Sequence, residues 1–544
     1  MTFASVTYTT LWAPLRSRVF AVLWCATLIG NIGAWIREVG SGWLMTELAP
    51  SPLMVALVQA AGTLPLFLLS LPSGALSDLL DRRKLLIAVQ VAMLSLAIGM
   101  AAGTVIGLMT PAILLLCVVA AGIGSAVSAP AWQALIPDLV RKEERKDAVA
   151  LGSLGIARAI GPALGGALIL MFGVAAPFFA CAAAQVAVLA ALLWWKRKDA
   201  PPTLPPEHLL PAIVAARRYA QASLPLRRTL VRTAIFFGFG SAPWALLPLF
   251  VRTDLGGSAG FYGTMFAAVG AGAIAGATAL PRLRTRYATD RLVIAATFLL
   301  SAVSLALALT RHQFLALSLM PLLGGAWVTV VTALNITTQS ILPDWVRGRG
   351  LALYLTVFNG AIAVGSLGWG QLADYTSTRT SLAAAAFLGA MSAIVAARIR
   401  LPDGTEDLTP SLHWPAPEGG LQPCDAGPVM ITVEYRIPPE RAELFAEAIE
   451  ALGASRRRSG AYAWGTFRDT AVPDRYLEYF LVATWVEHLR QHRRVSHADE
   501  AIQASVRALH AGNDPPRVSH YLEIGRRESR TPSWRASRAL DQPR

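Results

Sequence analysis

Long apolar segments separated by short polar ones dominate the first 400 residues of the chain. Breaking this region at prolines, glycines and clusters of charge leaves segments of about 20 residues, the length that a helix needs to cross a membrane. We expect twelve spans, at residues 19–46, 53–77, 85–107, 111–136, 147–171, 174–195, 229–251, 259–281, 291–310, 313–341, 349–373 and 380–397. The pattern therefore predicts an all-α polytopic membrane protein in this region.

The pattern changes after residue 427, where apolar residues recur over much shorter stretches. Four stretches alternate as strands do: Val429–Ile437, Tyr462–Phe467, Tyr476–Trp485 and Val518–Ile524. Two stretches have helical spacing: Pro439–Arg457 and Val486–Leu509. The order β-α-β-β-α-β predicts a small ferredoxin-like α+β domain. One apolar sheet face would stay uncovered, so we expect that this domain can form a dimer.

These changes of pattern divide the chain into seven parts. They are a cytoplasmic N-terminus (1–18), a six-helix bundle (19–195), a central cytoplasmic loop (196–228), a second six-helix bundle (229–400), a linker (401–427), the ferredoxin-like domain (428–525) and a tail (526–544). The tail is polar and rich in arginine and serine, so we expect it to be disordered.

Composition matters mainly through where the charges lie. The chain is 54% hydrophobic and 15% charged, with a net charge of +14. The loops on one side of the predicted spans hold 25 lysines and arginines, and the other side holds only Arg252, Arg311 and Arg379. Because cytoplasmic loops carry the excess of cations, both termini are predicted to be cytoplasmic, in a plasma or inner membrane. The basic charge thus indicates a lipid bilayer as partner and no nucleic acid.

A nine-residue segment occurs in both halves of the membrane region. Gln133–Arg141 reads QALIPDLVR, and Gln339–Arg347 reads QSILPDWVR. Each copy lies at the predicted cytoplasmic end, after the fourth span of its half. The similarity predicts two six-helix repeats and marks Pro343, Asp344 and Arg347 as a gate element of the second half.

The loop between the second and third predicted spans carries the motif Gly-x-Leu-x-Asp-x-x-x-Arg-Arg-Lys over Gly74–Lys84. It resembles the loop between helices 2 and 3 of major facilitator superfamily transporters, and its Asp-Arg-Arg form is similar to the enterobactin-exporter branch. The resemblance implies that Gly74, Asp78, Arg82 and Arg83 contact the opposite half and help latch the cytoplasmic gate. A generic basic loop at the membrane surface is the alternative.

Ionisable residues within predicted spans are candidates for a transport path. Placing a charge inside a span is costly, so such residues tend to face water or a partner. Glu38 lies about 12 Å from the outer end of the first span and is the best acid for binding a proton or cation. Asn31 lies on nearly the same face, and Arg37 is a further candidate for the same path. A structural pair of Glu38 with Arg37 is the alternative. Arg158, near the bilayer centre, would hold an anionic substrate or pair with an acid.

Small residues follow Arg158 in the sequence Gly161-Pro162-x-x-Gly165-Gly166. Glycines allow helices to approach closely and proline bends a helix, which suits a gate. The segment resembles the fifth-helix motif of facilitator antiporters, and this resemblance implies export. Ordinary packing of small residues is the alternative.

In the C-terminal region, Trp485–His492 resembles dimeric α+β barrel domains related to antibiotic-biosynthesis monooxygenases. Fold-level likeness does not transfer chemistry. His488 and His492 have the spacing of a metal-ligand pair, but no third ligand is fixed, so we expect a solvated helix face and no metal. We expect Trp485 in the core. The chain has no phosphate-binding loop, and its four cysteines lack zinc or disulfide spacing, so no cofactor is expected.

The sequence thus predicts a secondary active transporter and no enzyme. We expect a proton-coupled exporter that moves an amphipathic small molecule, such as a siderophore, drug or secondary metabolite, by alternating access. An importer or a broad multidrug pump is an alternative within transport. A membrane-tethered sensor or enzyme, with its activity in the C-terminal domain, is an alternative of another class.

Overall fold

The computed structural model describes residues 13–79, 81–139, 156–195, 217, 219–402, 406–414, 427–512 and 514–523. The chain divides into two compact units. The helical unit takes in most of the first 404 residues, and the sheet unit begins at Thr405. The sheet unit also includes two short segments from earlier in the chain, Val214–Leu224 and Leu342–Val346.

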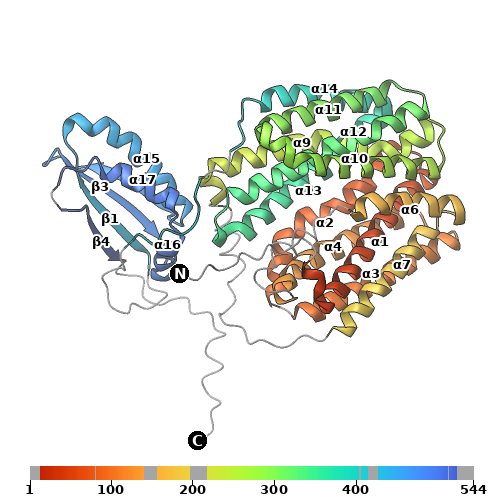
Figure 1. Cartoon of the computed structure of the whole chain (residues 1–544), viewed down its shortest axis with the longest axis horizontal. Coiled ribbons are helices and arrows are strands. Elements are labelled where there is room, and N and C mark those ends of the chain that lie inside the picture. Colours follow the sequence, from red (N-terminus) through yellow and green to blue (C-terminus); the bar gives the residue numbers. More distant parts are fainter. Residues whose placement is uncertain are drawn as a thin grey trace, which may run out of the picture. The chain divides into compact units, whose positions relative to one another are not determined.

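Two bundles make up the described part of the helical unit (Figure 1). After a 3-10 turn, Ala13–Arg16, the first bundle contains α1 (Arg18–Leu48), α2 (Pro52–Leu79), α3 (Arg82–Val105), α4 (Pro111–Leu139), α6 (Ile156–Phe172) and α7 (Ala176–Trp194). The second contains α9 (Leu224–Leu249) with a π-helical extension η3 (Phe250–Asp254), α10 (Ala259–Arg286), α11 (Thr289–Leu309), α12 (Gln313–Ser340), α13 (Asp344–Tyr375) and α14 (Thr378–Ala396).

These helices coincide with the predicted spans to within a few residues. In the described part of the chain, eleven helices are long and apolar enough to cross a membrane. The helix α6 is shorter, and the residues just before it, 140–155, lie outside the described ranges. Side-chain caps define several starts: Ser17, Asp81, Ser258 and Ser377 each accept a backbone N–H of the first turn.

The sheet unit contains four antiparallel strands in the order β2-β3-β1-β4. Along the chain its elements are β1 (Val429–Arg436), η4 (Pro439–Arg441), α15 (Ala442–Arg458), β2 (Ala463–Arg468), β3 (Arg475–Val482), α16 (Trp485–Arg494), α17 (His497–Arg507) and β4 (Arg517–Leu522). The inward residues Val433 and Tyr435 of β1 pack against Phe445, Ile449 and Val506 of the helices. The apolar stripe of β1 therefore joins the helices to the sheet.

Two sequence predictions in this unit were wrong. The single helix predicted at Val486–Leu509 is two helices, because Ser496 and Asp499 form a capping box that starts α17. The strand predicted to reach Trp485 ends at Val482, because Thr484 caps α16. Trp485 itself is only 7% exposed, so its predicted place in the core is confirmed.

Part of the predicted linker 401–427 is built into the sheet unit. Backbone hydrogen bonds join Ser411 to Val495, Thr409 to His497, and Asp407 to Ala498. This segment therefore lies along the junction of α16 and α17, and it brings Trp414 onto the unit. Its proline, glycine and aspartate content predicted a linker, whereas its backbone is hydrogen-bonded to the end of α16 and the start of α17.

Candidate functional site

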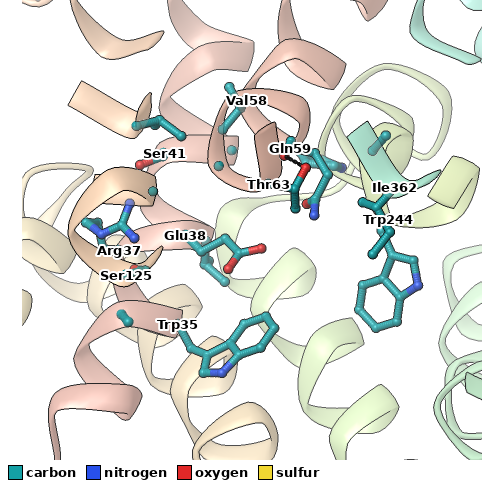
Figure 2. A pocket seen from close by; sticks show the side chains of 18 of the residues that line it. Trp35, Arg37, Glu38, Ser41, Val58, Gln59, Thr63, Ser125, Trp244 and Ile362 are labelled. Carbon is teal, nitrogen blue, oxygen red and sulfur yellow. Dashed lines mark hydrogen bonds between the residues drawn. The ribbon is translucent and has the colours of Figure 1, made fainter. Parts of the chain in front are cut away.

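A cavity of about 310 Å³ lies between the two bundles (Figure 2). Its wall comes from α1, α2 and α4 of the first bundle and from α9, α10, α12 and α13 of the second. Six aromatic residues line it: Trp35, Trp244, Tyr262, Phe266, Trp327 and Phe358. Polar side chains line it as well: Arg37, Glu38, Ser41, Gln59, Thr63, Ser125 and Asn359. Such a wall can hold a molecule that has both apolar and polar parts.

Glu38 provides the one carboxylate, and Arg37 the one guanidinium, among the described residues of this wall. Figure 2 shows the Glu38 carboxylate directed toward the middle of the cavity, with Gln59 and Thr63 beyond it. Glu38 also lies within electrostatic range of the Tyr262 phenol on α10. The acid of the first bundle therefore faces the second bundle across the cavity.

Arg37 lies on a different side of α1. Its guanidinium is within electrostatic range of Cys117 on α4 and Cys181 on α7, inside the first bundle. Neighbouring residues on a helix point about 100° apart, which separates Arg37 from the direction of Glu38.

Three buried polar atoms of the wall have no hydrogen-bond partner among the described residues. They are Arg37 Nε, Ser41 Oγ and Trp327 Nε1. Buried polar groups in proteins are nearly always hydrogen-bonded, so unpaired atoms that line one cavity indicate a place for a polar ligand group.

The glycines of the fifth-helix motif bring α6 close to two other helices. A Cβ on Gly161 would meet Trp35 of α1, and one on Gly165 would meet Val39 of α1. Gly166 faces Gly263 of α10, and either residue with a Cβ would collide with the other's backbone. Pro162 lies within α6 and is buried. Because α10 belongs to the second bundle, this motif contributes a backbone contact between the bundles.

Further contacts between the bundles lie at the same end of the helices. Arg252 Nη1 donates to Thr46 Oγ1 over 3.0 Å, and Ser51 Oγ donates to Asp374 Oδ1 over 2.7 Å. A Cβ on Gly370 of α13 would meet Ala56 of α2. All of these residues lie at the helix ends opposite to the turn between α2 and α3. These contacts therefore join the two bundles at the end away from that turn.

The motif of the α2–α3 turn is partly described. Gly74 and Asp78 lie in the last turns of α2, where their side chains fall outside the described part. Arg82 begins α3. Arg83 donates from Nε to Leu192 O over 3.1 Å and from Nη2 to Leu193 O over 3.0 Å. It thus caps the C-terminal end of α7 in its own bundle, where a cation is favourable.

The remaining predicted site residues are described only in part. Asn31 is exposed and does not line it. The side chains of Arg158 and Asp344 fall outside the described part of the chain. Pro343 is buried and Arg347 is exposed near the start of α13.

Sequence reasoning missed several residues of the wall. Gln59 and Asn359 are polar residues inside apolar spans, and that signal could have identified them. Nothing comparable distinguishes Trp244, Tyr262 or Trp327 from ordinary core aromatics, because only the packing of distant helices brings them together.

The expectation that His488 and His492 lie on a solvated helix face was wrong. His488 is 1% exposed, and its ring packs against His492 and His520 between α16 and the sheet. Trp485 and His488 are three residues apart on this short helix, so both lie on its one buried face. Among the described residues, no group of three or more His, Cys, Asp or Glu side chains is arranged to hold a metal ion.

A family model described as transmembrane secretion effector matches residues 9–528 of the chain. Among curated proteins, the chain is 25% identical over 341 residues to the staphyloferrin A transporter of Staphylococcus aureus, covering 62% of this chain and 85% of that protein. It is 25% identical over 378 residues to the multidrug efflux pump Tap of Mycolicibacterium fortuitum, covering 64% and 88%.

Solved structures share the fold of the helical unit. One is a bacterial homologue of the human lysosomal transporter Spinster in an inward-facing conformation, with a TM-score of 0.57, 16% identity, and coverage of 72% of this chain and 98% of that one. Another is a D-xylose–proton symporter, with a TM-score of 0.55, 13% identity, and coverage of 72% and 99%.

Proposed function

Since the chain belongs to the transmembrane secretion effector family, we propose that this major-facilitator-type transporter exports an amphipathic small molecule in exchange for protons. Its relatives include one protein named as a staphyloferrin A transporter and one named as a multidrug efflux pump. Both names support a small-molecule cargo, and the second supports efflux. The mixed aromatic and polar wall of the cavity favours a cargo with apolar and polar parts.

The observation that carries the proposal is the cavity between the bundles, with one carboxylate inside it and the bundles in contact at one end. A transporter that alternates between two access states needs a central site shared by both halves. Contacts that exist at one end in one state must break in the other, so their energies set the balance of the states.

We assign twelve spans by counting α6 with the eleven long helices. The excess of cations in loops of one parity orients these spans with both termini in the cytoplasm. On this orientation, the α2–α3 turn is cytoplasmic and the end where the bundles meet faces outward.

Glu38 is the residue that we propose to couple protons to cargo. In the outward-open state its carboxylate takes a proton from the more acidic exterior as cargo leaves. In the inward-open state it releases the proton to the cytoplasm, and the restored charge favours cargo binding near Gln59 and Thr63. Arg158, placed by its position in the sequence near mid-membrane, would bind an anionic part of the cargo.

The motif residues act as gates in this proposal. Gly161, Pro162, Gly165 and Gly166 allow closure at the outer end through α6 and α10. At the inner end, Gly74, Asp78, Arg82 and Arg83 form one latch. In the second half, Pro343, Asp344 and Arg347 are proposed as the corresponding element.

Everted membrane vesicles test the function and its direction. The vesicles carry the protein alone, their interior is acidified, and accumulation of ethidium and of staphyloferrin A is followed. An exporter should accumulate at least one probe inside these vesicles and release lumenal protons at the same time.

Accumulation in right-side-out vesicles under an inward proton gradient would instead identify an importer. If collapsing the pH gradient did not change accumulation in everted vesicles, the result would support export and exclude proton coupling.

A further inference from the structure

A second cavity, of about 380 Å³, lies in the sheet unit between the sheet and its helices. Its floor is formed by Phe480, Ile431 and His520, which are neighbours across β3, β1 and β4 in the strand register. Helix α15 contributes Arg456, α16 contributes His488 and His492, and α17 contributes Gln503 and Arg507. The volume lies within the range of small-molecule pockets.

The buried charge at this cavity is balanced within the protein. Arg456 is 4% exposed, and its Nε donates to Glu478 Oε1 over 3.0 Å. Glu478 is fully buried and also accepts from Tyr435 Oη over 3.0 Å and from Trp464 Nε1 over 3.1 Å. Both carboxylate oxygens are thus occupied by donors, so Glu478 has little capacity left to attract a cationic ligand.

Three imidazoles line the cavity and are neutral at physiological pH. Burial, mutual repulsion and the charge of Arg456 lower the pKa of His488 to about 3. The same causes lower the pKa of His492 to about 4, and burial lowers that of His520. His488 and His492 approach through their Nε2 atoms at 3.3 Å, and His488 Nδ1 lies 3.4 Å from Gln491 Oε1. Neutral imidazoles offer both a hydrogen-bond donor and an acceptor.

Trp414, which precedes β1 in the chain, closes one side of the cavity. Its Nε1 donates to Gln503 Oε1 over 2.8 Å, and its ring meets that of His492 edge-on with 5.0 Å between centroids. The Arg456 guanidinium lies 4.9 Å from both the Trp414 and the Phe480 ring. A short segment of predicted linker is therefore held in place to present a large flat aromatic surface to the cavity.

We propose that this cavity binds a planar aromatic molecule that carries a carboxylate or an acidic hydroxyl group. The rings of Trp414 and Phe480 line the cavity and provide apolar contacts for such a molecule. The histidines accept from a hydroxyl or donate to a carboxylate. Arg507 adds a positive charge to the wall, and no carboxylate is among the described residues that line it. This site is separate from the cavity between the bundles. The proposal of a ligand here does not depend on the proposed export.

Calorimetry on the full chain in lipid nanodiscs tests the proposal with 3-hydroxy-2-naphthoate as probe. Saturable binding is expected, whereas 2-naphthylmethylammonium, which has the same rings and a positive charge, should bind at least about tenfold more weakly. Trp414→Leu and His520→Ala should each weaken naphthoate binding about tenfold. His497→Ala, a change on an exposed histidine outside the cavity, should leave it unchanged.

A residue of the cavity between the bundles provides a second control. Trp244→Leu changes a tryptophan of the bundle cavity and should leave naphthoate binding unaltered. Loss of binding in Trp244→Leu, equal binding of the ammonium probe, or unchanged binding in Trp414→Leu would each overturn the proposal.

A measurement on the unaltered chain guards against variants that fail to fold. Diethyl pyrocarbonate modifies neutral histidines, and mass spectrometry locates the modified residues. The naphthoate should slow modification of His492 and His520 severalfold while His497 reacts as before. Equal protection of His497, or no protection of the other two, would contradict a site at this cavity.

Discussion

The two cavities of this chain hold their charged groups in opposite ways. In the bundle cavity, Glu38 and Arg37 point in different directions, and Arg37 Nε is among the buried atoms without a hydrogen-bond partner. In the sheet cavity, Arg456 and Glu478 bind each other directly, and two further donors complete the shell of Glu478. At the first cavity a buried guanidinium nitrogen has no hydrogen-bond partner among the described residues, whereas at the second the buried ion pair is completed by further donors.

This difference follows from what each site has to do. A transport site must exchange partners between two access states, so no single conformation can satisfy all of its polar groups. A site that only holds a ligand gains from a fully paired network, which fixes the shape of the cavity. Changes at the first cavity should therefore alter turnover, and changes at the second should alter stability and ligand binding.

The largest effect is expected from Glu38→Gln. The amide keeps the shape of the side chain but cannot exchange a proton, so efflux driven by a pH gradient should fall to background. Insertion should be unchanged, because the variant removes a charge from a span. Transport of ethidium and staphyloferrin A in everted vesicles provides the measurement.

Glu47→Gln is the matched control for this variant. Glu47 is on the same helix, accepts a hydrogen bond from Trp43 Nε1 and does not line the cavity. Its transport should remain near that of the unaltered chain. Normal gradient-driven efflux by Glu38→Gln would exclude Glu38 from coupling.

Gly166→Ala should give the next largest effect. The added Cβ would collide with Gly263 of α10, so the bundles could no longer meet at the outer end. We expect efflux to fall about tenfold or more, with Ser41→Cys becoming reactive to a membrane-impermeant maleimide added outside. Gly99→Ala is the control, because no atom lies within 4 Å of the Cβ it adds. Equal behaviour of the two alanine variants would show that the close contact is not needed for closure.

Glu478→Gln tests the satisfied network of the second cavity. Removing one partner of a buried ion pair leaves Arg456 uncompensated and costs about 3–5 kcal/mol. The sheet unit should exchange backbone hydrogens faster and lose naphthoate binding, while exchange in the membrane spans stays unchanged. Arg456→Met combined with Glu478→Leu removes both charges and should restore much of the stability. A double variant no more stable than Glu478→Gln would contradict this account of the pair.

The order of helices could be predicted from sequence because a membrane leaves the chain few options. Each span needs about 20 apolar residues, so the predicted segments and the observed helices differ mainly at their ends. Glu38 was identifiable for the same reason, since an acid stands out in an apolar segment. The fifth-helix glycines stood out in sequence as well, but their partner Gly263 could be found only from the packing.

The second cavity was not predictable in the same way. The spacing of His488 and His492 is equally compatible with a solvent-exposed helix face and with a buried one. Their burial depends on the start of α17 at Ser496, which shortens α16, and on Trp414, which comes from a segment with the composition of a linker. Packing between residues far apart in the sequence forms such a site, so the local sequence pattern cannot predict it.

The buried histidines predict how the sheet unit responds to pH. The pKa values of His488 and His492 in the folded chain, about 3 and about 4, lie below the ordinary value near 6.5. Between about pH 6.5 and 4 the unfolded chain therefore binds more protons, so stability falls as pH falls through this window. The slope is at most about 1.4 kcal/mol per pH unit for each histidine.

Hydrogen exchange of β1 and β3 peptides, corrected for the intrinsic effect of pH, measures this loss between pH 7 and pH 5. The pKa of Asp499 is lowered by Arg458 and by Ser455 and Ser496, against the opposing effect of its burial, and that carboxylate adds to the loss only below about pH 4. His488→Phe should flatten the profile, whereas His497→Gln should not. A profile that rises toward low pH would mean that the imidazoles are charged in the folded protein.

The smallest effect is expected from Ser51→Ala. This change removes a hydrogen bond to Asp374 at the outer end, in an exposed place where such a bond contributes about 0.5–1 kcal/mol. It also removes the long bond of 3.5 Å that Ser51 Oγ accepts from Met54 N–H within its own bundle. The ratio of outward-open to outward-closed protein should rise about twofold to fivefold, measured by the same maleimide reaction at Ser41→Cys. Thr46→Ala, which removes the partner of Arg252, should act similarly. An effect as large as that of Gly166→Ala would mean that polar contacts, and not the close approach of α6 to α10, hold the outer end closed.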